Sequence, residues 1–554
     1  MYIKQVRIHN FKRFSDWYEV DLTSGTNIMV GPNEVGKSTI IEAIHLALTG
    51  FYQGRYVRND ISQYLFNQHA VESYLASVQA GAAIDPPSME IELVFDGDCP
   101  KMRGNHNAQH IEKTGLFYKI CFDSETYQDE YNRLLQTRDL TTLPVEYYHV
   151  VWRFFHRDDI TSRSIPYHSS FIDTTTQHQA PADLYVSHII KNKLDDNDKV
   201  SITQSYRKAQ QTFMADEAIL GINAKLAEMA SIDGQNVTLS IDLSSRRAWE
   251  DALTAYLDKI PFHYLGKGGQ CYIKTKLALA QQENDEPGIT LIEEPENHLS
   301  FAKLNGLIRT IVENNDNQQL IITTHSSFVL NKLKLSSLIL LSPNGKFRLT
   351  GLSEDTITYF EKLAGYDTLR LLLSKKTILV EGDSDELVIQ RAYKDRTGHL
   401  PIEDGIDVLC VRGLAFLRFL EIAKALQLNV AVVTDNDGNV DALRDKYKDY
   451  IGEHATSNIK IFFDADIDTK TTFSIPEGDT TLPTEFNFNT LEPKMLKANG
   501  LAVLQRIFAG YDTNAKILRH MHADKGLTGL AFFKTEEVLS YPNYIQEAIE
   551  WANE

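Results

Sequence analysis

A glycine-rich stretch near the start of the chain has the residue types and spacing of a phosphate-binding loop. Residues 31–38 read GPNEVGKS, which fits the pattern GxxxxGK[ST]. An apolar run precedes it and an apolar helical pattern follows it, so backbone amides at the helix start would point at phosphate. Lys37 would reach the β- and γ-phosphates, and Ser38 would bind Mg²⁺. The residues predicted to contact nucleotide here are Asn33, Gly36, Lys37, Ser38 and Thr39.

Two later apolar runs end in groups suited to nucleotide hydrolysis. Residues 289–292 read ITLI and are followed by Glu293 and Glu294. We predict that Glu293 holds the metal, directly or through water, and that Glu294 orients or deprotonates the attacking water. His325 ends the next such run, residues 321–324, and is predicted to sense the γ-phosphate. The alternatives are a solvated loop start for the acidic pair and a structural role for the histidine.

A second glycine-rich segment, residues 266–270 (GKGGQ), precedes a helix expected to begin near Tyr272. Glycines at a helix start form a phosphate cradle. Because this cradle is far from the first in sequence, we expect a composite site with each nucleotide clamped between two subunits. Gly266, Gly268 and Gln270 are the predicted nucleotide contacts, and a plain loop is the alternative.

A second set of carboxylates follows two apolar runs in the last third of the chain. Residues 377–380 (TILV) run into Glu381, with Asp385 at the start of a predicted helix, and the run ending at Val433 precedes Asp435 and Asp437. The carboxyl ends of parallel strands converge on one crevice. Hard oxygen ligands suit Mg²⁺ or Mn²⁺. The sequence therefore predicts a divalent-metal site, with a turn or helix cap as the alternative for the DxD residues.

These groups need strands and helices to position them, and the apolar patterns predict an α/β chain. Predicted strands cover residues 3–8, 26–30, 89–95, 289–293, 320–324, 338–341, 377–380, 406–411, 430–433 and 459–463. Predicted helices cover residues 37–49, 301–313, 385–395, 416–427 and 441–450, with a helical hairpin over 193–230. The expected domains are an ATPase head split between residues 1–155 and 261–371, a helical insert over 156–260 that is expected to dimerise the chain, and a second α/β domain over 372–554, after a linker near 342–372.

Composition narrows the function classes. Lys and Arg number 56 and Asp and Glu 75, a net charge of −19, which argues against a protein that coats nucleic acid electrostatically. It leaves room for an enzyme that holds metal ions with carboxylates. The four cysteines form no CxxC pair, which argues against a zinc finger or a disulfide scaffold. With no signal-peptide pattern and no apolar run near 18 residues, we expect a cytoplasmic protein with no membrane partner.

The nucleotide motifs resemble the ABC-type ATPase head of the SMC and RecF kind. An opening strand followed by residues 10–12 (NFK), the phosphate loop, GKGGQ as signature, the acidic pair and His325 stand in the family order. The signature lacks the serine of LSGGQ, which puts its contact with the opposing γ-phosphate in doubt. The glutamine of the Q-loop is either Gln53 or Gln63.

The later carboxylates resemble those of the Toprim domain of primases, topoisomerases and certain nucleases. An ATPase head followed by Toprim looks like the OLD family of ATP-dependent endonucleases, which includes the nuclease subunit of Gabija defence systems. That resemblance implies metal-linked or acid/base chemistry at Glu381, metal binding at the DxD residues and at Glu492, and charge stabilisation by Lys525. Relatives often have Glu where this chain has Asp385, so ligation there is less certain. Asp464 and Asp466 also end a predicted strand and compete for a metal role.

Together the motifs predict an ATP-regulated, Mg²⁺- or Mn²⁺-dependent DNA endonuclease or nickase that forms a homodimer or higher homo-oligomer. The family resemblance implies antiphage defence, alone or with a helicase-like partner or a reverse transcriptase and its DNA product. The main alternative is a RecF-like DNA-repair ATPase with a non-cleaving Toprim domain. A topoisomerase- or primase-like enzyme and an ABC transporter ATPase are weaker alternatives.

Overall fold

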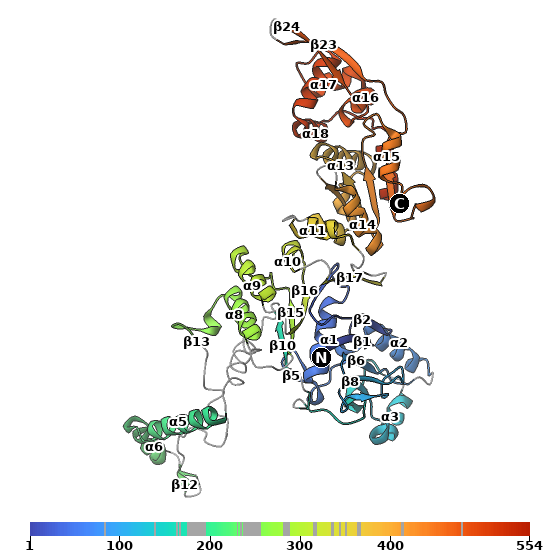
Figure 1. The fold of residues 1–554 in the computed structure, drawn as a ribbon. Coiled ribbons are helices and arrows are strands. Elements are labelled where there is room, and N and C mark those ends of the chain that lie inside the picture. The colour runs from blue at the N-terminus through green and yellow to red at the C-terminus, as the bar shows by residue number, and fades with distance from the viewer. Residues whose placement is uncertain are drawn as a thin grey trace. The chain divides into compact units, whose positions relative to one another are not determined.

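The computed structural model describes residues 1–81, 85–137, 140–161, 164–165, 168–173, 196–229, 231–232, 235–236, 256–280, 288–313, 318–333, 337–342, 345–348, 352–362, 367–411, 415–477 and 480–554. The chain divides into two compact units, shown in Figure 1. The first contains Met1–Ile28 and Gly36–Thr324, and the second contains Met29–Val35 and His325–Glu554.

An antiparallel sheet with the strand order β2-β1-β6-β8-β7 occupies the start of the chain, and β9 pairs with the other side of β8. Its strands are β1 Tyr2–His9, β2 Tyr18–Asp21, β6 Met89–Asp96, β7 Arg103–Gly104, β8 Lys113–Phe122 and β9 Tyr148–Phe154. Helices α2 Gln68–Gln79 and α3 Ser124–Thr137 lie in the same stretch of chain. The sequence reading recognised only β1 and β6 of this sheet, because the other strands mix polar and aromatic residues without a strict period of two.

A second six-stranded sheet has the order β10-β15-β16-β3-β17-β18. Its strands are β3 Thr26–Val30, β10 His168–Asp173, β15 Gly288–Glu293, β16 Gln318–Thr323, β17 Leu338–Ser342 and β18 Gly345–Arg348. β10, β15 and β16 run parallel, so the two strands that end at Glu293 and Thr323 finish at the same edge. β10 falls in the stretch expected to be a helical insert. Pairing with the buried strand β15 overrides the polar composition around it.

The predicted helix after the phosphate loop is α1, Lys37–Thr49, and it ends as expected at Gly50. Gly50 has a φ of 75°, and its N–H donates to the carbonyl of Leu46. Trp152 on β9 donates from Nε1 to the carbonyl of Ala47 at 2.9 Å, and the ring of His45 packs beside Phe171 on β10. These contacts fix the helix between both sheets, and with it the loop from which the helix starts.

The predicted helical hairpin corresponds to α5 Asp196–Met214 and α6 Glu217–Met229, while residues 193–195 and 230 lie outside the described part of the chain. The short hairpins β11 Ser231–Ile232 with β12 Gln235–Asn236 and β13 Tyr256–Leu257 with β14 Ile260–Pro261 follow. Helix α9, Phe301–Glu313, has the predicted bounds. Helix α8, Lys267–Ala280, begins at Lys267 rather than near Tyr272, so the glycine-rich segment forms its first turn. The sequence placed the start too late because Gly268 and Gly269 lie in the first turn and glycine has a low helix propensity.

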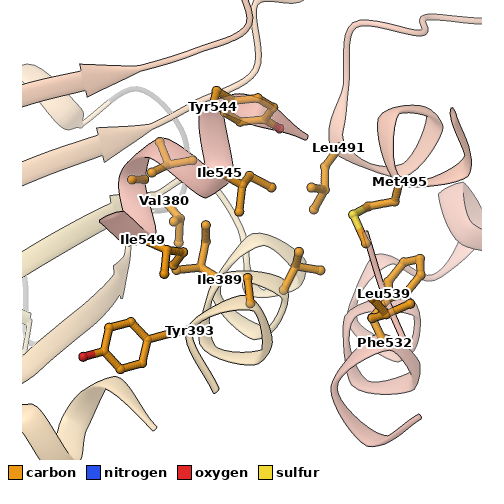
Figure 2. Close-up of a cluster of buried hydrophobic side chains, with 14 of the residues drawn as sticks. Val380, Ile389, Tyr393, Leu491, Met495, Phe532, Leu539, Tyr544, Ile545 and Ile549 are labelled. Carbon is orange, nitrogen blue, oxygen red and sulfur yellow. The ribbon is translucent and has the colours of Figure 1, made fainter. Parts of the chain in front are cut away.

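The second unit contains a parallel four-stranded sheet with the order β20-β19-β21-β22, as expected for a separate α/β domain. Its strands are β19 Lys376–Val380, β20 Ile406–Cys410, β21 Val430–Val433 and β22 Ile459–Phe462, followed by the hairpin β23 Thr471–Glu477 and β24 Thr480–Phe486. Its helices are α13 Asp383–Thr397, α14 Phe416–Leu426, α15 Val440–Lys446, α16 Leu491–Ile507, α17 Asn514–Ala523, α18 Lys525–Lys534 and α19 Asn543–Asn553. Figure 2 shows the buried core between α13, α16, α18 and α19, with Ile389, Leu491, Met495 and Phe532 among its members.

The described residues of the segment expected to be a linker, residues 342–372, form regular elements and belong to the second unit. The segment contains β18, α11 Glu354–Lys362 and the first residues of α12 Asp367–Leu373, after α10 Ser327–Lys332. The guanidinium of Arg370 binds the carboxylate of Asp407 through Nε and Nη2. Glu421 on α14 accepts hydrogen bonds from the Ser353 and Thr356 hydroxyls at the start of α11. Among the described residues, no helix is both long and apolar enough to cross a membrane.

Candidate functional site

The phosphate loop has the backbone that its sequence predicts. Gly36 precedes α1 with a φ of 101°, in the left-handed region that favours glycine. A Cβ placed on Gly36 would lie 2.5 Å from Cζ of Phe14, so the position excludes any side chain. Lys37 and Thr39 are buried, whereas Ser38 and Asn33 are exposed. No side chain caps the start of α1, and a helix start of this kind commonly binds an anion through its first-turn amides.

Lys37 is electrically coupled to the acidic pair at the end of β15. Burial lowers the pKa of the Lys37 ammonium, and the nearby carboxylates of Glu294 and Glu293 partly oppose that shift. Glu293 is buried at the strand end, and Glu294 occupies the following turn with a φ of 44°. The structure therefore brings Lys37, Glu293 and Glu294 into one neighbourhood, as the spacing of the motifs predicts.

Hydrogen bonds hold Glu294 in that strained turn. Its N–H donates to the carbonyl of Thr323, at the end of β16, at 3.0 Å. Asn297 Nδ2 donates to Glu294 Oε2 at 2.7 Å, which aims the carboxylate. Asn297 was missed by sequence reasoning, although it stands only three residues after the glutamate. His325 is partly buried, two residues beyond β16, and belongs to the second compact unit.

The glycines of the second predicted cradle have different surroundings. A Cβ on Gly266 would meet nothing within 4 Å, so this glycine faces open space at the start of α8. A Cβ on Gly268 would lie 2.0 Å from the carbonyl oxygen of His298, so α8 rests on the turn that follows Glu294. Gln270 Nε2 donates to the carbonyl of Leu265 at 2.9 Å and thus supports its own loop.

The carboxyl edge of the parallel sheet in the second unit gathers the predicted acidic residues. Glu381 follows β19, and Asp435 and Asp437 follow its neighbour β21. Asp435 accepts from the Leu491 N–H at 3.0 Å through Oδ2 and from the Tyr544 hydroxyl at 3.3 Å through Oδ1. These bonds bring the starts of α16 and α19 to the DxD segment.

Glu492 and Lys525 join the same group. Glu492 is 3% exposed, and its Oε1 lies 3.4 Å from Nζ of Lys525. Asp385 stands in the first turn of α13, where Oδ2 accepts the Gly382 N–H at 3.2 Å, so it also caps its own helix. Asp437 is exposed, with a φ of 50°.

The pKa values of this group show crowded negative charge. Burial, then the carboxylates of Glu492 and Glu381, raise the pKa of Asp385 to about 7 against the pull of Lys525. Burial, then Asp385 and Glu492, hold the pKa of Asp435 well above its usual range. Repulsion between carboxylates that one cation would relieve is typical of metal-binding and catalytic sites.

The donor set fits Mg²⁺ or Mn²⁺ in chemistry, because every side chain offers hard oxygen. Within the described ranges, no three His, Cys, Asp or Glu side chains form a ready-made metal cage. Mg²⁺ commonly uses one or two carboxylates and completes its shell with water and substrate phosphate. Such an ion suits this open group better than one that needs a closed protein cage.

Three asparagines connect the loops around Asp435. Asn436 is 2% exposed, and its Nδ2 donates to the carbonyls of Asp464 at 2.7 Å and Asp466 at 2.9 Å. Asn489 exchanges hydrogen bonds with the backbone of Asp468, and Asn487 donates to the carbonyl of Asp437. Sequence reasoning missed this scaffold, because each contact joins loops distant in the chain.

Asp464, one of two competitors for a metal role, already has a cation. The buried ammonium of Lys494 binds Asp464 and lies 3.5 Å from Oδ2 of Asp468. Lys497 binds the other oxygen of Asp468 at 2.6 Å. Asp466 is exposed, and its N–H donates to Asp464 Oδ1. Lys494 and Lys497 therefore neutralise the carboxylates of Asp464 and Asp468 in the loop over residues 464–468.

Three families match parts of the chain. Residues 5–236 match an AAA domain, and residues 257–331 match the AAA domain described as putative AbiEii toxin, Type IV TA system. Residues 372–437 match the Toprim domain of overcoming lysogenization defect protein-like proteins. The expected fold class is confirmed in its main parts: an α/β chain in which an AAA-type ATPase region precedes a C-terminal Toprim domain.

Curated relatives cover a smaller part of the chain. The DNA replication and repair protein RecF of Pediococcus pentosaceus is 31% identical over 126 residues, which is 23% of this chain and 32% of that protein. RecF of Clostridium botulinum is 32% identical over 85 residues, or 15% of this chain and 23% of that protein. The alignments therefore span a third or less of these relatives.

Two solved SMC heads are similar at low scores. The SMC head bound to the C-winged helix domain of ScpA has a TM-score of 0.32 and 14% identity, covering 63% of this chain and 98% of that one. The SMC head domain from Thermotoga maritima has a TM-score of 0.28 and 13% identity, covering 63% and 100%.

Proposed function

We propose that this protein is an ATP-regulated, divalent-metal-dependent DNA endonuclease or nickase. The chain joins an AAA-type ATPase domain to an OLD-like Toprim domain, which is the arrangement of OLD-family ATPase–Toprim fusions. One observation carries the proposal. Glu381 and Asp435 follow neighbouring parallel strands, Asp435 bonds to the start of α16, and Glu492 on that helix lies 3.4 Å from the ammonium of Lys525. That group has the charges needed to bind a metal and a phosphodiester together.

The acidic residues of this edge would hold the metal: Glu381, Asp385, Asp435, Asp437 and Glu492. When bound, a divalent cation neutralises phosphate charge and lowers the pKa of a coordinated water. Tyr544 and the Leu491 N–H keep Asp435 oriented. An exposed residue, Glu381, remains accessible to act on an incoming water.

Lys525 would stabilise negative charge that develops on the phosphate. Burial alone would lower the pKa of this lysine, but Glu492, Asp385 and Asp435 outweigh it and raise the pKa. The side chain therefore stays protonated at neutral pH. It is 54% exposed, so a phosphate can reach the ammonium group.

ATP would bind at the phosphate loop and control access to the acidic edge. Lys37, Ser38 and Thr39 would contact nucleotide at the start of α1, with Asn33 and Gly36 shaping the loop, Glu293 near the metal and Glu294 aimed at water. The exposed Gly266 at the start of α8 supports a composite site in a homodimer or higher homo-oligomer, to which Gly268 and Gln270 would contribute mainly by holding the loop. His325 would sense the γ-phosphate.

The biological setting we propose is antiphage defence, on the strength of the Toprim family that the chain matches. DNA is the proposed substrate, and a helicase-like protein or a reverse transcriptase with its DNA product are proposed partners. With a net charge of −19, the chain must hold DNA through local cations and bridging metal.

A cleavage assay on supercoiled plasmid DNA tests the nuclease proposal. The wild-type protein, with Mg²⁺ or Mn²⁺ and each nucleotide state, should nick or linearise the plasmid. Glu381→Ala and Asp435→Ala should abolish cleavage while ATP hydrolysis continues. DNA that stays intact under all these conditions, or normal cleavage by both variants, refutes the proposal.

The RecF matches favour a second candidate, a DNA-repair ATPase whose Toprim domain binds without cutting. Slow ATP turnover stimulated by DNA ends, with no strand scission in any metal, would support it over the nuclease.

A further inference from the structure

Helices α13 and α18 run side by side and in the same direction, and both begin at the carboxyl edge of the sheet, where the acidic residues gather. Asp385 lies in the first turn of α13, and Lys525 is the first residue of α18. The two residues interact electrostatically at these starts. Towards the other ends, Arg391 on α13 contacts the last carbonyls of α18. The distance between the helices therefore sets where the lysine lies relative to the acidic residues.

Gly529, one turn after Lys525, lies in close contact with α13. A Cβ added there would lie 2.8 Å from the Cα of Ser384 and 3.2 Å from both the Ser384 carbonyl oxygen and Leu387 Cδ1. Two of these three obstacles are backbone atoms of α13, which cannot rotate away. Any side chain at this position must push the two helices apart.

Arg391 fixes the other end of the same pair. Its Nη1 donates to the carbonyls of Phe532 at 3.2 Å and Phe533 at 3.0 Å and also to Thr535, and its Nη2 donates to Glu537 at 3.3 Å. The last carbonyls of a helix have no partner within the helix and carry negative partial charge, so a buried guanidinium there is stabilising. A second contact, from Nε to Asp395 at 2.7 Å, holds the guanidinium in place.

We propose that Gly529 and Arg391 are positioning residues that hold α18 against α13 and so keep the Lys525 ammonium in place relative to Asp385 at the start of α13. Neither residue touches substrate. Each acts through the lysine, the glycine by permitting close approach and the arginine by tying down the carbonyl end of α18. The inference rests on the proposed nuclease function, since its consequence is a rate of DNA cleavage.

A double-mutant cycle separates positioning from general packing. Single-turnover cleavage of supercoiled plasmid, at saturating metal and protein, is measured for wild type, Gly529→Ala, Lys525→Ala and the double variant. We expect Gly529→Ala to slow cleavage by roughly 10- to 100-fold, the effect of misplacing a reacting group by about 1 Å, with DNA affinity unchanged. The double variant should cleave no more slowly than Lys525→Ala alone. Should Lys525→Ala leave nothing to measure, Lys525→Arg takes its place in the cycle.

Gly526→Ala is the matched control in the same helix, because a Cβ there meets only Asp524 Oδ1 at 3.7 Å. It should cleave at the wild-type rate. Arg391→Lys, which keeps a cation but loses the fork of donors, should give a smaller defect than Arg391→Gln. Arg391→Gln replaces Gly529→Ala in the double-mutant cycle if thermal melting shows that Gly529→Ala does not fold.

The outcomes are distinct. A wild-type rate for Gly529→Ala and Arg391→Gln, or losses that multiply with that of the lysine variant, overturn the positioning roles and leave the nuclease proposal intact. A wild-type protein that cuts no DNA overturns both.

Discussion

The hydrogen bonds of Asn436 give the sharpest prediction for the acidic edge. Its Nδ2 donates to the carbonyls of Asp464 at 2.7 Å and Asp466 at 2.9 Å, and its Oδ1 accepts from the Gly438 N–H at 2.9 Å. Asn436→Ala removes all three bonds at a site that is 2% exposed. Two of these bonds reach the loop between residues 464 and 468, so at roughly 1 kcal/mol for each bond that loop loses about 2 kcal/mol of local stability.

Hydrogen exchange read by mass spectrometry measures this loss directly. About 2 kcal/mol corresponds to roughly 30-fold faster exchange in a peptide covering residues 462–468, where the Asp466 N–H bonds to Asp464 Oδ1. Metal-dependent cleavage should fall as well, because Asp435 and Asp437 flank the altered residue.

Asn439→Ala is the matched control, three residues further along the chain. The Asn439 side chain is exposed and accepts one hydrogen bond, from the Ala442 N–H at the start of α15. Its loss removes a helix cap worth about 1 kcal/mol and touches no other loop. Unchanged exchange over residues 462–468 in Asn436→Ala, or equal acceleration in both variants, would refute the account of Asn436 as the link between these loops.

Three further predictions concern nucleotide and DNA. Gly36→Ala should weaken binding of a fluorescent ATP analogue at least tenfold, because the new Cβ meets the Phe14 ring. Adding Phe14→Ala should restore only part of the lost affinity, since the left-handed backbone at residue 36 still costs about 1–2 kcal/mol. Full recovery of ATP affinity in the double variant would contradict this explanation. Asn297→Ala should slow ATP hydrolysis by roughly tenfold with ATP affinity unchanged, because Glu294 loses its orienting bond; an altered affinity with a normal rate would point elsewhere. DNA binding, followed by fluorescence anisotropy, should weaken steeply with added salt and with EDTA, and indifference to both would rule out bridging metal and local cations.

The sequence was most informative where an apolar strand runs directly into charged residues. The strand that ends at Glu293 and the strands just before Glu381 and Asp435 could be located because buried parallel strands are continuous apolar runs. Placing Asp435 and Glu381 at one edge then needed only the rule that parallel strands finish together. The same reasoning could not predict the hydrogen bond from the Tyr544 hydroxyl to Asp435, because the two residues are 109 positions apart in the sequence.

The parts that were missed depend on partners rather than on local pattern. β10 forms because β15 lies beside it, and its own composition gives no indication of a strand. The contacts of Asn436 and Asn489 are to backbone carbonyls, which every residue has, so no residue type identifies the partner in advance. Gly529 matters only because Ser384 of another helix lies where its side chain would be.

The attachment of residues 352–373 to the second unit defines how the Toprim part can be separated from the rest. A fragment beginning at residue 372, where the family match begins, would lack Arg370 and leave the buried carboxylate of Asp407 without its guanidinium. It would also strip Glu421 of the hydroxyl donors at the start of α11. Cutting instead before residue 352 keeps both sets of contacts, so a stable Toprim fragment needs about twenty residues upstream of the stretch that matches the family.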